Sequence, residues 1–216
     1  MAVTGLVMIG FLLMHMFGNL KVFLGADEYN HYAGWLKGTT EDGGLAAPIL
    51  PAGWFLWIFR AVLLLAIVLH MYSAWVLTQR AHDARSVKYV NNKRVQQTYS
   101  SRTMRWGGVI LASFLVFHLL QFTAQVAKTG FKAGATPYEM VMASFSQWWL
   151  VLLYAIWVFI VTSHVRHGVW SALATLGAHT SPRARSALNS LAWVVAVLLF
   201  VGFMVMPVGI LFGFGR

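Results

Sequence analysis

The sequence predicts an all-α integral membrane protein with five transmembrane helices. Of its 216 residues, 59% are hydrophobic and only 10% are charged, whereas a soluble domain carries about a quarter charged residues. A helix needs about 20 apolar residues to cross a bilayer. Five runs of this kind occur, near residues 2–24, 53–79, 105–128, 147–176 and 188–213. We expect one transmembrane domain over 1–216, in which the first four helices form a bundle and the fifth is peripheral.

The first apolar run begins at Met1, with no basic leader and no small-residue cleavage site before the polar loop. We therefore interpret it as a retained helix and not as a cleaved signal peptide. The basic residues that usually precede such a helix are missing, which suggests a true start further upstream.

The loops between the apolar runs alternate in charge. The first loop, residues 25–52, is acidic and is expected to carry a short surface helix over 27–36, while the third, 129–146, is nearly neutral. The second and fourth loops are basic and carry Arg80, Arg85, Lys88, Lys93, Arg94, Arg102, Arg105, Arg183 and Arg185. Because basic loops stay in the cytoplasm, we expect a cytoplasmic N-terminus and an external C-terminus. The net charge of +10 is thus explained by topology and not by nucleic-acid binding.

The chain contains no cysteine. This excludes disulfides, zinc–thiolate sites, iron–sulfur ligation by this chain and covalent attachment of haem through a Cys-x-x-Cys-His motif. Any haem must therefore be held non-covalently, by histidine or methionine.

The first four helices each contain one histidine deep in the apolar run: His15, His70, His118 and His164. An ionisable residue at this depth is costly, so it is a functional candidate. Four axial ligands suffice for two haems, and helical bundles build such sites from inward-facing side chains. Ligation by two histidines saturates the iron, which suits electron transfer.

Depth predicts how these histidines pair. At about 1.5 Å per residue, His70 lies ~15 Å from the cytoplasmic end of its helix, His118 ~20 Å and His15 ~21 Å. His15 and His118 therefore form the outer pair. His70 must pair with the fourth helix, where His164 and His167 lie three residues apart on one face. Depth alone slightly favours His167, and both remain open at this point.

Other interpretations of these polar residues remain. Proton relays also use intramembrane histidine, but they usually recruit Asp or Glu, and all six acidic residues lie in loops. A haem-free anchor or transporter, in which the histidines only form hydrogen bonds, is the alternative from another functional class. Arg60 and Arg166 either extend to the interface or pair with haem propionates.

Motifs over nearly the whole chain carry a family resemblance. They are Met1-Ala-Val-Thr-Gly-Leu with His15-Met-Phe-Gly-Asn-Leu-Lys-Val-Phe, Tyr29-Asn-His-Tyr-Ala, Arg60 with His70, Thr103-Met-Arg-Trp-Gly-Gly with His118, and His164-x-x-x-Gly168-x-Trp170-Ser171, which runs on to Gly177 and Ser181-Pro182. With them the chain resembles the membrane anchor of succinate:quinone oxidoreductases and fumarate reductases, in the class with one five-helix cytochrome b subunit that holds two haems. The last motif is the most specific.

The resemblance implies an assignment of the ligands. The helix IV ligand would be His164, four residues before the glycine, and His167 would contact a propionate or support a ligand. The family pairs the ligands of helices II and IV around the haem nearer the cytoplasm. Its helix I and helix III ligands, here His15 and His118, would hold the outer haem.

The resemblance also implies a function: the membrane anchor and electron-transfer subunit of succinate dehydrogenase, in the respiratory chain and the tricarboxylic acid cycle. A flavoprotein subunit and an iron–sulfur subunit would sit on the cytoplasmic face of a bacterial cell membrane, and this chain would perform no succinate chemistry. The cofactors would be two haems b and a quinone, with menaquinone favoured over ubiquinone. The anchor of a hydrogenase or formate dehydrogenase is the alternative within electron transfer.

Reduction of a quinone consumes two protons, so its pocket needs polar groups that water can reach. Two sets of residues meet this requirement, and the sequence does not choose between them. The outer set is Asn19, Lys21, Tyr29, Arg60 and Glu139, and the inner set is Tyr72, Arg166 and His167.

Overall fold

The computed structural model describes residues 1–84 and 99–215, with backbone only for 99–103. The described chain is all-helical, and its helices are α1 (Ala2–Leu20), η1 (Lys21–Leu24), α2 (Ala26–Lys37), α3 (Trp54–Asp83), α4 (Tyr99–His118), η2 (Leu119–Thr123), α5 (Pro137–Phe145), α6 (Trp148–Thr175) and α7 (Pro182–Leu211). Five segments are long and apolar enough to cross a membrane: Ala2–Leu24, Trp54–Asp83, Met104–Thr123, Trp148–Thr175 and Pro182–Leu211. The prediction of a multi-pass, all-α membrane protein is confirmed at this level.

Several helix boundaries differ from those expected. Helix α3 continues to Asp83 and not to residue 79, and α4 begins at Tyr99 and not near residue 105. The third membrane helix ends at Thr123, in the π-helical turn η2, and not near residue 128. The fifth begins at Pro182 and not near 188, because the Ser181 hydroxyl accepts a hydrogen bond of 3.1 Å from the Ala184 N–H and proline occupies the first helical position. A side-chain acceptor and an early proline are both typical of helix starts.

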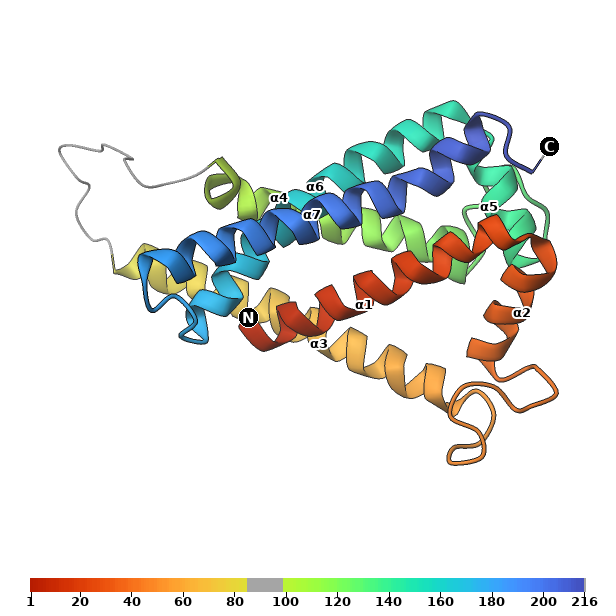
Figure 1. Cartoon of the computed structure of the whole chain (residues 1–216), viewed down its shortest axis with the longest axis horizontal. Helices are drawn as coiled ribbons and strands as arrows, with labels where there is room; N and C mark the ends of the chain where they lie inside the picture. Colours follow the sequence, from red (N-terminus) through yellow and green to blue (C-terminus); the bar gives the residue numbers. More distant parts are fainter. Residues whose placement is uncertain (85–98, 216) are drawn as a thin grey trace.

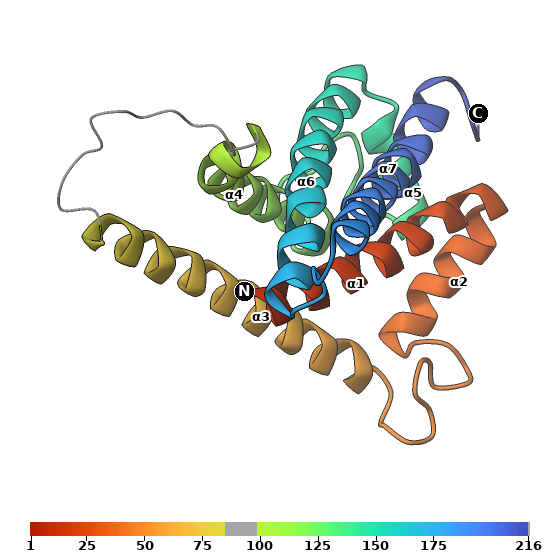
Figure 2. The same cartoon turned by 60° about the vertical axis from the view of Figure 1, so that its left-hand side comes forward.

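The long helices form an open arrangement around α1 and α6 (Figures 1 and 2). Helix α6 packs along α7, while α1 packs against α3, α6 and α7, and α4 packs against α6. In Figure 2, α3 stands apart from α4. Helix α3 packs mainly against α1, and α4 mainly against α6, so neither α1 with α4 nor α3 with α6 is one of the main helix–helix contacts of the described chain.

The fifth membrane helix, α7, was expected at the periphery of the bundle, but it packs into the core. Ala192, Leu199 and Ile210 of α7 are completely buried. Gly202 lies directly against the side chain of Met16 on α1. Small residues let membrane helices approach closely, so α7 is part of the packed core, although it carries none of the four intramembrane histidines.

Two short helices cover one end of the molecule. The predicted surface helix is present as α2, and α5 is an additional helix in the third loop, where none was expected. The two meet where Asn30 Oδ1 accepts a hydrogen bond of 3.0 Å from the Tyr138 N–H. The C-terminus lies at the same end in Figure 1, and the α6–α7 connection lies at the other. This agrees with the prediction that the first and third loops lie at one end of the molecule and the fourth at the other. Arg85, Lys88, Lys93 and Arg94 of the second loop lie outside the described residues.

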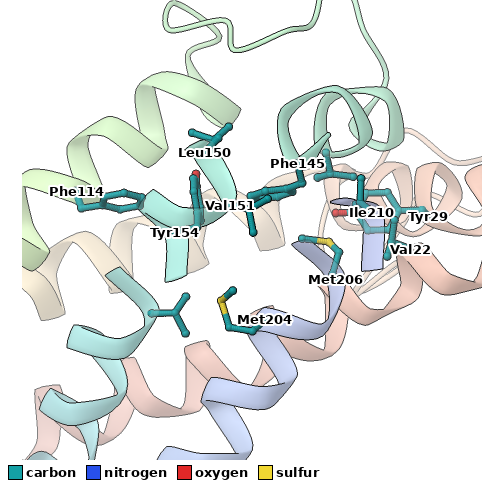
Figure 3. Close-up of a cluster of buried hydrophobic side chains, with 12 residues drawn as sticks. Val22, Tyr29, Phe114, Phe145, Leu150, Val151, Tyr154, Met204, Met206 and Ile210 are labelled. Atoms are coloured by element: carbon teal, nitrogen blue, oxygen red, sulfur yellow. The ribbon is translucent and has the colours of Figure 1, made fainter. Parts of the chain in front are cut away.

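The larger buried cluster joins side chains of η1, α2, α4, α5, α6 and α7 (Figure 3). At its centre, Tyr154 of α6 lies between Phe114 and Phe145, with both ring centroids 5.0 Å away. This cluster fixes one wall of the histidine site described next.

Candidate functional site

The four intramembrane histidines form two pairs. The ring centroids of His15 and His118 are 6.0 Å apart, and those of His70 and His164 are 6.3 Å apart. The first pair joins α1 to α4, and the second joins α3 to α6. On α6, it is therefore His164 and not His167 that faces His70.

The two pairs lie at different depths along α1. A Cβ atom on Gly5 would be 3.6 Å from Cε1 of His70, so the His70/His164 pair lies beside the start of α1. His15 follows Gly5 by ten residues, which corresponds to about 15 Å along the helix axis. The structure thus stacks the two pairs along the bundle, in the order that the depth argument predicted.

The spacing within each pair fits two imidazoles on opposite sides of one metal ion. A metal–imidazole bond is about 2 Å long, which places the ring centroids roughly 6 Å apart. Two histidines are a ligand set by which a protein can hold a haem. The donor set of each pair would therefore fit a haem.

The hydrogen bonds of His118 fix which ring nitrogen is free. Its Nδ1 lies 3.0 Å from the hydroxyl of Tyr154. That hydroxyl donates its own proton to Gln121 Oε1, at 2.7 Å, so it acts as the acceptor toward His118. Nδ1 then carries the imidazole proton, and the lone pair is on Nε2, the arrangement that a metal-ligating histidine needs.

His70 is held in the same way by a residue of α1. Its Nδ1 lies 3.1 Å from the hydroxyl of Thr4, and Thr4 donates its proton to the carbonyl of Met1, at 3.0 Å. Nδ1 of His70 is therefore the donor, and its Nε2 also has a free lone pair.

The remaining two histidines have no such hydrogen bond within the described part of the chain. Nδ1 of His164 is buried without a partner. The imidazole of His15 stacks on Phe11 at 5.3 Å and also lies near Phe203 of α7. An unpaired buried polar atom in an apolar site is costly, which marks the His164 ring as a site where a bound group would have room to act.

The two arginines proposed for propionates are engaged elsewhere. The guanidinium of Arg60 lies 4.9 Å from the ring of Trp57 on an exposed face of α3. Arg166 stacks over Trp193 of α7 at 4.5 Å and donates to Asn189 Oδ1 at 3.0 Å. The propionate role of both residues stays a prediction that these contacts do not favour.

Among the outer quinone candidates, Lys21 has the most suitable surroundings. It lies with its ammonium 5.0 Å from the ring of Tyr32 and lines a pocket of about 370 Å³, together with Phe17, Glu28, His31, Tyr32, Trp35 and Asp42. The pocket combines aromatic rings with titratable groups. Asn19 lies two residues before Lys21 at the end of α1 and is half-buried.

Two other outer candidates have structural roles. Glu139 forms a capping box with Thr136 at the start of α5, in which its carboxylate accepts from the Thr136 N–H at 2.7 Å. Tyr29 is buried against Tyr138, and burial, with a contribution from Tyr32, raises its pKa to about 12. Tyr29 therefore stays protonated at physiological pH.

The inner candidates are spread over two helices. Tyr72 is exposed on α3 beside Trp75, and His167 is half-buried on α6 next to Arg166. The structure does not bring Tyr72 together with the other two.

Sequence reasoning missed the residues that orient the histidines: Thr4, Gln121 and Tyr154. A polar side chain inside an apolar run was the available signal, because such a group needs a partner. A comparison of the chain with protein families, curated proteins and solved structures finds no match.

Proposed function

We propose that this chain is the diheme cytochrome b anchor of a succinate:quinone oxidoreductase, which conducts electrons from an iron–sulfur subunit to a membrane quinone. The observation that carries the proposal is the geometry of the histidines. Two pairs, each drawn from two helices and each 6.0–6.3 Å between ring centroids, are stacked along one bundle. No hydrogen bond joins the two rings of either pair within the described chain, so the rings that face each other do not satisfy one another.

In this proposal His15 and His118 hold the outer haem, and His70 and His164 the inner one. Haem iron supplies a one-electron redox change when it is bound between two histidines. Tyr154 and Thr4 keep one proton on Nδ1 of His118 and His70, so that Nε2 of each presents a lone pair. Apolar side chains such as Phe11 and Phe203 keep water away from His15.

The two ends of the molecule suit different partners. Arg183 and Arg185 lie at the end opposite α2 and α5, and their charge supports docking of the flavoprotein and iron–sulfur subunits on the cytoplasmic face of a bacterial membrane. At the other end, the pocket around Lys21 supports a quinone site. Its aromatic rings would hold the quinone ring, and its titratable groups are within reach of water for proton transfer.

The first experiment is a pyridine haemochrome assay of the purified protein. We expect two b haems per polypeptide, and the same number in the control variant His179→Ala, because His179 is exposed in the α6–α7 connection. A folded, colourless protein from iron-replete cells would support the haem-free anchor or transporter instead.

A second measurement separates succinate dehydrogenase from other diheme anchors. In membranes that contain the complete complex, succinate should reduce the b haems, and malonate should block this reduction. Reduction by hydrogen or formate, without a response to succinate, would identify the alternative anchor.

A further inference from the structure

A buried row of hydrogen bonds begins at His118 and leads away from the histidine pair. Tyr154 of α6 contacts His118, and Gln121 of η2 contacts Tyr154 at 2.7 Å. Gln121 Nε2 then contacts the hydroxyls of Thr129 and Ser144. The row therefore joins α4, η2, the following loop, α5 and α6.

The protons in this row all point away from His118. The Ser144 hydroxyl donates to the carbonyl of Thr129 at 3.2 Å, so its oxygen accepts from Gln121. The Gln121 amide is a donor at Nε2 and an acceptor at Oε1, which receives the Tyr154 hydroxyl proton. Tyr154 in turn can only accept from His118. Hydrogen bonds aligned in one direction polarise one another.

The row lies in the dry part of the molecule. Gln121 and Ser144 are completely buried, and Tyr154 is 6% exposed. Gln121 also lies in a π-helical turn directly after His118, a distortion that is frequent at functional sites. A buried network of this kind is retained only where every member is satisfied, and here the side chains of all its members after His118 have partners.

From this geometry we infer that Tyr154 and Gln121 are positioning residues for His118, which fix its tautomer and make its imidazole a stronger electron donor to a bound metal. The inference rests on the proposed function. A hydrogen bond from the far nitrogen of a ligating histidine orients the ring and raises its basicity. A more basic axial ligand stabilises the oxidised metal, and second-shell hydrogen bonds of this kind tune haem potentials.

The test is a redox titration of both haems in Tyr154→Phe. We expect two haems per chain, with the midpoint potential of the His15/His118 haem shifted upward and that of the other haem unchanged. The affected haem is identified as the one that is lost in His118→Ala. Tyr138→Phe is the matched control, since Tyr138 lies in α5 at the same end of the molecule and its ring packs on Tyr29; both potentials should stay at their wild-type values.

Gln121→Leu adds a second readout. Without Oε1, the hydroxyl of Tyr154 can turn its proton toward Nδ1 of His118, which places the imidazole proton on Nε2 and blocks ligation. We expect a loss of occupancy at the His15/His118 haem alone, while the His70/His164 haem reports that the protein is folded.

An unchanged potential in Tyr154→Phe, or an equal shift of both haems, would overturn the inference and leave the proposed function intact. A wild-type protein without haem would overturn the proposed function and this inference with it.

Discussion

The two histidine pairs differ in what holds them in place. The His15/His118 pair is enclosed by aromatic side chains from four helices: Phe11, Phe122, Tyr154, Trp157 and Phe203. The His70/His164 pair has one hydrogen-bond partner, Thr4, close to the N-terminus of α1. His70 belongs to α3, a helix whose single buried residue is Ala66.

This difference shows that two histidine pairs with similar spacing can be held in place in two ways. The outer pair is built into the hydrophobic core, so its geometry is fixed by packing. The inner pair depends on the position of α1 beside α3 and on Gly5, which faces His70. We therefore expect the inner site to respond to changes in α1 and the outer site to changes in α6 and η2.

The largest expected effect is the loss of a whole cofactor. His15→Ala and His118→Ala should each lower the haem content from two per chain to one and remove the same haem, because either substitution leaves one axial ligand. His70→Ala and His164→Ala should each remove the other haem. Haem content and the two b-type spectra measure this. If His70→Ala and His164→Ala removed different haems, the pairing would be wrong.

Gly5 offers a way to break only the inner pair. A Cβ here would lie 3.6 Å from His70 Cε1, an ordinary contact distance, so Gly5→Ala should keep both haems. The branched side chain of Gly5→Val would press on the imidazole. Overpacking costs about 1–3 kcal/mol, which corresponds to roughly tenfold to hundredfold weaker binding of the inner haem. Titration of the haem-depleted protein with haem measures this, and weakening at the outer site instead would contradict the placement of Gly5.

Thr4→Val should give a smaller effect on the same haem. It removes the acceptor for Nδ1 of His70 while keeping the shape of the side chain. Such a hydrogen bond contributes about 1 kcal/mol, so the upward shift of the inner haem potential should not exceed roughly 40 mV for one electron. Thr4→Ser keeps the hydroxyl and should restore the wild-type value. A shift confined to the outer haem would show that Thr4 does not act on His70.

The smallest effect is expected for His167→Ala. Because His164 faces His70 in the structure, this variant should keep two haems with nearly unchanged spectra. Loss of the inner haem would make His167 the ligand of α6. This measurement therefore decides which histidine of α6 pairs with His70, and it leaves the His15/His118 pair unchanged.

Much of the fold could be predicted because membrane spans are local features. The burial of about 20 apolar residues is decided along one helix. The five spans agree with the structure except for shifts of several residues near Asp83, Tyr99, Thr123 and Pro182. The depth order of His70 and His15 also followed from the fixed rise of a helix. The short helix α5 was not predicted, because residues 129–146 were interpreted as a loop. The Thr136 and Glu139 capping box that starts this helix could have been recognised in the sequence.

The sequence by itself determined the number of membrane helices, the depth of each histidine and the absence of cysteine chemistry. Only the tertiary structure decided that His70 faces His164, that Arg166 packs on Trp193 of α7, and that Tyr154 and Thr4 orient the imidazoles. The physical reason is that periodicity fixes which residues share a helix face, but the rotation of each helix about its axis depends on how its neighbours pack. For the same reason, the burial of α7 in the core depends on Gly202 meeting Met16, a contact between residues at opposite ends of the chain.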